Sequence, residues 1–248
     1  MNSVVKQIPN FITILNLVSG VIALFFAIDG HLTSAGIFIC ISAVFDFLDG
    51  MAARLLDAHS DIGKNLDSLA DLVSFGVAPA AILLTLLKLS MFGKNLPVYE
   101  ITAEWDQWLI LSTICLMPVA GAWRLARFNA FQADDPFFRG LPIPSNGLFW
   151  ASLGIIQSLP HWQIFFKLIY STQNLMTMGL FTSGMMIITM PMFSLKFKNL
   201  SIKDNWYRYL FLILTLILLI TLKTVGFPLV ILSYIALNII LYLARFKY

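Results

Sequence analysis

The 248-residue sequence contains little charge: Asp, Glu, Lys and Arg make up 12% of it, whereas an ordinary soluble domain has about 25%. Hydrophobic residues account for 59% of the chain, and the mean hydropathy is +0.84. A water-soluble globule of this size could not bury so much apolar side chain, so lipid must cover part of it. The scarcity of charge therefore excludes a soluble domain and predicts an integral membrane protein.

Cysteine is also scarce, and the two cysteines, Cys40 and Cys115, lie in separate apolar segments. Without a C-x-x-C spacing, they indicate neither a disulfide framework nor a thiolate zinc site. The net charge of +3 is small and dispersed along the chain, so we expect no nucleic-acid partner.

Long apolar runs dominate the rest of the chain. A window of about 20 residues, the length of a membrane-crossing helix, finds eight segments: 11–29, 34–56, 67–92, 107–128, 143–159, 174–194, 206–222 and 225–244. They predict an all-α, polytopic membrane bundle of about eight helices, forming a single domain over residues 1–248. Most of the 16 Lys and Arg residues fall on the side of both termini, which predicts that both termini are cytoplasmic.

Four carboxylates interrupt the apolar pattern in the segment 34–92. Asp46 and Asp49 lie near the end of the second predicted span, and Asp67 and Asp71 lie at the start of the third. At about 100° per residue, each pair falls on one face of its helix. Ionised carboxylates at membrane depth are costly unless they are paired or bind a metal, so they indicate a functional site.

The connection between these two spans is short, so we expect antiparallel neighbouring helices whose acidic faces oppose each other. Opposed carboxylates repel, and cations must lie between them. Oxygen-only ligands select Mg²⁺, Mn²⁺ or Ca²⁺, and two such ions suit phosphoryl-type chemistry. The alternative, ion pairing with Arg54 and Lys64, supplies too few cations for the acidic residues of this segment.

The complete pattern is Asp46-x-x-Asp49-Gly50-x-x-Ala53-Arg54-x8-Gly63-x-x-x-Asp67-x-x-x-Asp71. It resembles the signature of the CDP-alcohol phosphatidyltransferase family at every fixed position. The resemblance implies that Asp46, Asp49, Asp67 and Asp71 bind two metal ions, and that Asp71 is also the general base toward the acceptor hydroxyl. It further implies a CDP pocket with these members: Gly50, Ala53, Arg54, Ser60, Asn10 and Thr13.

The acceptor alcohol is indicated by other stretches. Ser74 to Pro79, Arg124 to Asn129 and Phe138 to Pro144 resemble the phosphatidylserine synthase branch of the family, although Ser145-Asn146 replace the Ala often found after the second Pro. This resemblance implies transfer of a phosphatidyl group from CDP-diacylglycerol to L-serine with release of CMP, in the cell membrane with the active site facing the cytoplasm. Relatives of this kind are usually homodimers, so a homodimer is expected.

A serine carboxylate needs a cationic partner, and arginine suits a carboxylate best. Arg124, Arg127 and Arg139 are the candidates for binding the acceptor or the lipid phosphate; a purely topological role is the alternative. Within the family, the competing function is phosphatidylglycerophosphate synthase or a relative that uses another acceptor. In another class, it is a divalent-cation transporter, although the acidic residues have no counterpart in the second half of the chain.

Overall fold

The computed structural model of the protein describes residues 7–58, 60–131, 138–159, 168–195 and 201–245. Its longer helices are α1 (Ile8–Ile28), α2 (Leu32–Leu55), α3 (Asp61–Asp71), α4 (Ala78–Phe92), α5 (Trp105–Ser112), α6 (Leu116–Phe131), α7 (Ile143–Ile156), α9 (Thr172–Ile187), α10 (Ile202–Leu222) and α11 (Gly226–Leu243). A π-helical turn, η2 (Leu72–Val77), joins α3 to α4, and three short 3-10 turns are η3 (Val98–Glu100), η4 (Thr113–Cys115) and η6 (Lys223–Val225). The strands β1 (Phe138–Arg139) and β2 (Pro191–Met192) pair antiparallel. The all-α prediction is therefore confirmed.

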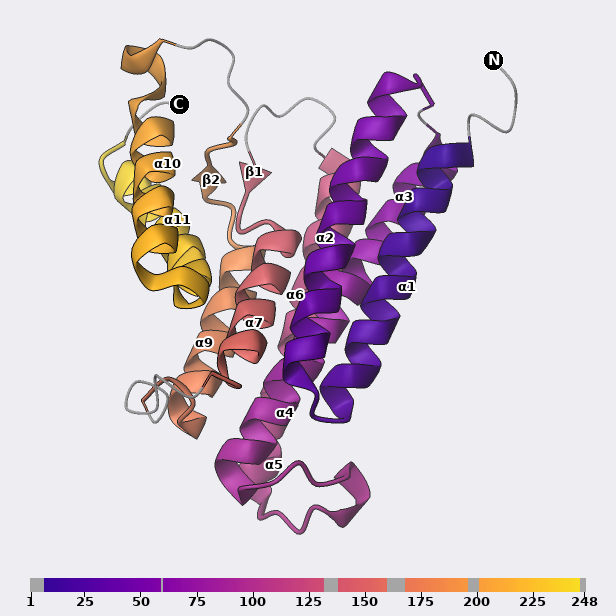
Figure 1. Ribbon diagram of the computed structural model, residues 1–248, viewed down its shortest axis with the longest axis vertical. Helices are drawn as coiled ribbons and strands as arrows, with labels where there is room; N and C mark the ends of the chain where they lie inside the picture. The colour runs from indigo at the N-terminus through magenta and orange to yellow at the C-terminus, as the bar shows by residue number, and fades with distance from the viewer. Residues whose placement is uncertain (1–6, 59, 132–137, 160–167, 196–200, 246–248) are drawn as a thin grey trace.

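Five helical runs among the described residues are long and apolar enough to cross a membrane: Ile8–Ile28, Leu32–Leu55, Asp61–Phe92, Trp105–Ala130 and Ile202–Leu243. The first four correspond to the first four predicted segments. The fifth run contains the last two predicted segments, because it folds back at η6 into the pair α10 and α11 (Figure 1). The fifth and sixth segments form α7 and α9, which have 14 and 16 residues and fall short of a full span. The count of eight is not confirmed.

Helix α1 packs against α2 and against the continuous run formed by α3, η2 and α4, which passes behind both helices in Figure 1. Its buried face is small: Ser19, Gly20, Ala23 and Ala27 allow close approach of the neighbouring helices. Helix α2 also contacts η2 and α4 directly, and carboxylates of α2 and α3 approach each other. The second and third predicted spans are therefore neighbours, as predicted, and α1 packs against both of them.

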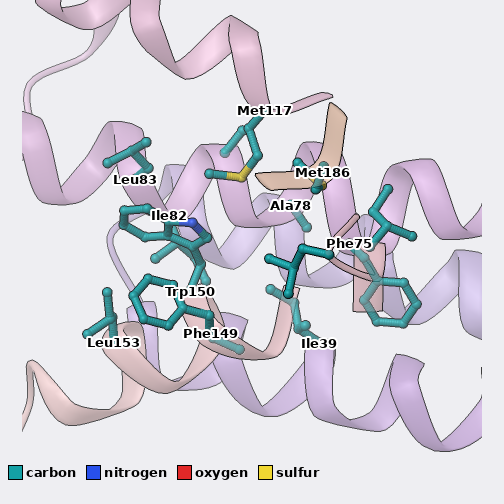
Figure 2. Close-up of a cluster of buried hydrophobic side chains, with 14 of the residues drawn as sticks. Ile39, Phe75, Ala78, Ile82, Leu83, Met117, Phe149, Trp150, Leu153 and Met186 are labelled. Carbon is teal, nitrogen blue, oxygen red and sulfur yellow. The ribbon is translucent and has the colours of Figure 1, made fainter. Parts of the chain in front are cut away.

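The apolar core brings together residues from most of the helices. Ile39 of α2, Ile82 of α4, Met117 of α6, Trp150 of α7 and Met186 of α9 are each completely buried, and Figure 2 shows them in one cluster. The core thus fixes α4 and α7 in the interior, and it holds the helices that carry the acidic residues at constant spacing.

The pair α10 and α11 joins this core through buried residues that include Phe211 and Ile235. Helix α10 packs mainly on α11, and α11 contacts α7 and β2 (Figure 1). Helix α1 begins, and α11 ends, at the same end of the molecule as the connection between α2 and α3 (Figure 1). The start of α1, the end of α11 and the connection between α2 and α3 thus share one end of the molecule, and the candidate site lies near this end.

Candidate active site

A cavity of about 890 Å³ opens where the start of α1, the end of α2 and the start of α3 meet. It is lined by Pro9, Asn10, Thr13, Asp49, Gly50, Ala53, Arg54, Ala58, Ser60, Asp61, Gly63, Lys64, Asp67 and Phe128. All six residues predicted for the CDP pocket are in this set. The predicted residues Asp46, Asp71, Arg124, Arg127 and Arg139 do not line it.

Three carboxylates converge at the inner side of this cavity. Asp46 and Asp49 come from α2 and Asp67 comes from α3, and one carboxylate oxygen from each lies within 4.8 Å of the others. Asp49 is buried, at 5% exposure, and Oδ1 of Asp67 is buried without a hydrogen-bond partner. The sequence therefore predicted correctly that carboxylates from the two helices face each other.

Asp71, the fourth carboxylate, lies one helical turn beyond Asp67 on α3 and is 7% exposed. It interacts electrostatically with Asp46, Asp67 and Asp49, so it belongs to the same electrostatic cluster. Its Oδ1 accepts a hydrogen bond from Asn16 Nδ2 at 3.3 Å. Asp71 thus lies next to the convergent trio, held from the side of α1.

Two polar side chains of α1 hold two of these carboxylates. Thr13 Oγ1 donates to Asp49 Oδ2 at 2.7 Å, and Asn16, three residues further along α1, donates to Asp71. The backbone carbonyl of Asn16 accepts hydrogen bonds from Ser42 Oγ of α2 and Ser74 Oγ of η2, both at 3.1 Å. Helix α1 is therefore tied both to the carboxylates and to the two segments that carry them.

The connection between α2 and α3 forms the outer rim of the cavity. Ser60 caps the start of α3: its Oγ accepts a hydrogen bond from Gly63 N at 3.0 Å. Gly63 allows Asn10 to come close, because a Cβ atom at residue 63 would lie 2.8 Å from Asn10 Oδ1. The predicted pocket residues Asn10 and Ser60 thus meet at Gly63.

The two cations near this rim do not neutralise the carboxylates. Lys64 Nζ donates to the backbone carbonyl of Asn129 on α6 at 3.2 Å. Arg54 borders the cavity, and within the described ranges neither cation forms an ion pair with the acidic cluster. The alternative of simple ion pairing is therefore not supported, and the cluster is left with excess negative charge.

The three arginines have different environments. Arg124, on α6, is 7% exposed, its Nε has no hydrogen-bond partner, and its charge interacts favourably with Asp71. Arg127 donates to the carbonyl oxygens of Ile187 and Ile188 at the end of α9, where a cation is favoured. The backbone of Arg139 lies in β1, opposite Pro191. Arg124 is thus the arginine oriented toward the acidic cluster.

The donor set at the cluster fits a divalent metal. Its ligands are carboxylate oxygens, the type that Mg²⁺ and Mn²⁺ prefer. The unpartnered Asp67 Oδ1 is a buried acceptor that a cation would satisfy. The trio can therefore hold a metal ion.

Asn16 is the residue of this site that sequence reasoning missed. It is an amide in an otherwise apolar span, which is itself a signal of function or of interhelical bonding. It also lies three residues after Thr13, on the same helix face. Only the fold, however, reveals that its partner is Asp71, which is 55 residues away in the sequence.

Known proteins with similar sequences show which family the chain belongs to. The sequence profile of one family, described as CDP-alcohol phosphatidyltransferase, matches residues 6–185. The chain is 38% identical over 145 residues to a protein of Bacillus subtilis (strain 168) named CDP-diacylglycerol–serine O-phosphatidyltransferase, an alignment covering 58% of this chain and 72% of that protein. It is 40% identical over 156 residues to the protein of that name in Saccharomyces cerevisiae, covering 56% of this chain and 50% of the relative.

A third relative is archaetidylserine synthase of Methanothermobacter thermautotrophicus, which is 34% identical over 140 residues; the alignment covers 55% of this chain and 53% of that protein. The chain thus spans about three quarters of the Bacillus relative and about half of the other two. The family profile covers well over half of the chain and includes every residue of the acidic cluster and its cavity. The chain belongs to the CDP-alcohol phosphatidyltransferase family.

Proposed function

We propose that the protein transfers a phosphatidyl group from CDP-diacylglycerol to L-serine, giving phosphatidylserine and CMP. The observation that carries the proposal is the convergence of Asp46, Asp49 and Asp67 at the inner side of a cavity bordered by Arg54. The names of the relatives from Bacillus and Saccharomyces support the choice of donor and acceptor. In this proposal the active site faces the cytoplasm. The cavity lies at the end of the molecule where α1 begins and α11 ends (Figure 1), and the distribution of Lys and Arg predicts that both termini are cytoplasmic.

The CDP part of the donor binds in the cavity. Gly50 and Ala53 leave space along α2, Asn10, Thr13 and Ser60 supply polar contacts, and Arg54 meets the diphosphate. Asp46, Asp49, Asp67 and Asp71 hold two divalent cations, Mg²⁺ or Mn²⁺. Bound there, the cations offset the negative charge of the diphosphate and of the departing CMP.

Asp71 acts as the general base in this mechanism. It accepts the proton of the serine hydroxyl while the serine oxygen forms a bond to the lipid-linked phosphorus, and the bond from that phosphorus to the CMP oxygen breaks. The hydrogen bond from Asn16 Nδ2 to Oδ1 fixes the orientation of the Asp71 carboxylate. The proton then passes to solvent on the side of the cavity.

Arg124 binds the serine carboxylate in this proposal. It is buried with an unpartnered Nε and interacts electrostatically with the proposed base, whereas Arg127 already caps the end of α9. A buried guanidinium N–H without a hydrogen-bond partner is costly, and a substrate carboxylate would supply that partner. Arg127 and Arg139 remain candidates for contact with the lipid phosphate.

We further propose that the chain is a single domain and forms a homodimer in the membrane. Contacts of α11 with α7 and β2 support the single domain. The dimer is inferred from the family resemblance alone. Crosslinking in native membranes tests it: a band at twice the monomer mass is expected, and an exclusively monomeric protein would contradict the proposal.

An acceptor panel tests the function directly. Purified protein, CDP-diacylglycerol, Mn²⁺ and labelled serine are expected to yield phosphatidylserine and CMP in equal amounts, and a chelator should stop both. Activity with glycerol 3-phosphate but not with serine would instead assign the protein as a phosphatidylglycerophosphate synthase. Mn²⁺ flux into proteoliposomes without lipid product would favour the transporter.

A further inference from the structure

The π-helical turn η2 directly follows Asp71, and a proline, Pro79, lies two residues after its end. In an α-helix the carbonyl of Phe75 would accept from the N–H of residue 79, but residue 79 is proline and has no N–H. The turn instead shows the wider π pattern, with Ala78 N donating to Val73 O. In a membrane-spanning run, a carbonyl left without a donor is costly because no water can replace the bond.

Asn146 of α7 donates a hydrogen bond to the carbonyl of Phe75. Its Nδ2 donates to the carbonyl oxygen of Phe75 at 3.1 Å, and the side chain is completely buried. Its own Oδ1 has no partner among the described residues. The bond to Phe75 is therefore the interaction that orients this amide.

Close packing keeps α7 on the π-turn. A Cβ atom at Gly147 would lie 2.7 Å from Phe75 Cδ1 and 3.1 Å from Phe75 Cα, so the absence of a side chain there allows the two backbones to approach. Figure 2 shows Phe75 beside Ile39 and Ala78, at the edge of the buried core. The turn is thus held by the core on the side of α7.

The opposite side of the turn is tied to α1 and, through it, to Asp71. Ser74 Oγ donates to the backbone carbonyl of Asn16, and the side chain of Asn16 donates to Asp71. A π-turn also adds a residue relative to a regular helix, which rotates the helix before the turn by about 100° relative to the helix after it. The acidic face of α3 can then meet α2 while α4 keeps its apolar face in the core.

We propose that Asn146 is a positioning residue for Asp71: it fixes the register of the π-turn by donating to the carbonyl of Phe75, and so holds the carboxylate at the reacting hydroxyl. This inference rests on the proposed function, in which Asp71 is the base. It also links Ser74 to Pro79, one of the stretches noted in the sequence, to Asn146, which lies just after another, Phe138 to Pro144.

The test is Asn146→Leu, which keeps a similar volume and removes the donor. The value of kcat with serine is expected to fall about 10- to 100-fold, as for a small misplacement of a catalytic group. The KM for CDP-diacylglycerol should stay unchanged, because the cavity is lined by other segments. Mn²⁺ affinity, measured without substrates by electron paramagnetic resonance, should weaken, because Asp71 is a proposed ligand.

The matched control is Thr85→Val. Thr85 Oγ1 donates to Ala27 O at 2.7 Å, so this buried side chain of α4 also satisfies a backbone carbonyl, but it lies further from the acidic cluster. Thr85→Val is expected to lower thermal stability without changing kcat or Mn²⁺ affinity. If Asn146→Leu does not accumulate as folded protein, Asn146→Ala is assayed in the same way.

Two results would overturn the inference: an Asn146 variant that loses stability like Thr85→Val with kcat and Mn²⁺ affinity intact, or one whose only kinetic defect is a raised KM for CDP-diacylglycerol. Failure of the proposed function looks different. In that case the wild-type protein itself forms no phosphatidylserine, or binds no Mn²⁺.

Discussion

The hydrogen bond between Thr13 and Asp49 offers the sharpest test of the metal site. Thr13→Val keeps the shape of the side chain and removes the hydroxyl that donates to Asp49 Oδ2 at 2.7 Å. Both residues are buried, with exposures of 3% and 5%, although both border the cavity, so the loss of the donor leaves Asp49 Oδ2 with only water to replace it. A hydrogen bond to a charged group contributes about 1.5–3 kcal/mol, which corresponds to about 10- to 100-fold in an equilibrium constant.

The same range is expected from the loss of a group that orients a metal ligand, about 10- to 100-fold in metal affinity. We therefore expect Thr13→Val to weaken Mn²⁺ binding by this factor in a titration followed by electron paramagnetic resonance. Thr13→Ser, which retains the hydroxyl, is the control and should bind Mn²⁺ like the wild type. Equal Mn²⁺ affinity in Thr13→Val and the wild type would refute the reasoning that Thr13 positions Asp49 for a cation.

Three further predictions concern the base, the acceptor and the rim. Asp71→Asn should abolish turnover while the protein keeps its thermal stability, since the change removes the base at nearly constant volume; near-normal turnover would reject Asp71 as base. Arg124→Gln should raise the KM for serine by at least about tenfold, because the change removes one charge-assisted hydrogen bond to the substrate. Arg127→Gln should instead lower thermal stability and leave the KM for serine unchanged. Equal effects of the two variants on this KM would contradict the assignment of Arg124. Ser60→Ala should lower the free energy of unfolding by about 1 kcal/mol through loss of the cap on α3, measured by denaturation in mixed micelles; unaltered stability would show that the cap does not contribute.

The acidic cluster could be predicted from the sequence because its signals are local. Asp46 with Asp49, and Asp67 with Asp71, each lie within about one helical turn, and charges in an apolar span stand out against their surroundings. The helical periodicity was enough to place each pair on one face. The convergence of the two faces could also be predicted, from the short connection between the two spans.

The path of α1 could not be predicted in the same way. Its contacts join residues 36 and 55 positions apart, as in the bonds from Thr13 to Asp49 and from Asn16 to Asp71. No local pattern in the sequence reports such pairs. The small residues of α1 indicate only that other helices can pack closely on it.

Helices α7 and α9 show a second limit. Hydropathy alone does not distinguish apolar residues that are buried in the protein from those that face lipid. Helix α7 is buried over most of its length. A helix that is covered by its neighbours need not span the full bilayer thickness. The apolar stretches in the sequence are therefore longer than helices α7 and α9 themselves. The predicted segments 206–222 and 225–244, in contrast, both lie within the exposed run Ile202–Leu243 or end one residue beyond it.

The small side chains of α1 keep this helix close to the turn that follows the acidic residues of α3. At Gly20 a methyl group would meet Ser74 Oγ at 2.2 Å. Even the smallest side chain there would push α1 away from the π-turn and strain the hydrogen bonds that join Asn16 to Ser74 and to Asp71. The arrangement of the acidic cluster thus depends on a helix that contributes none of the acidic residues.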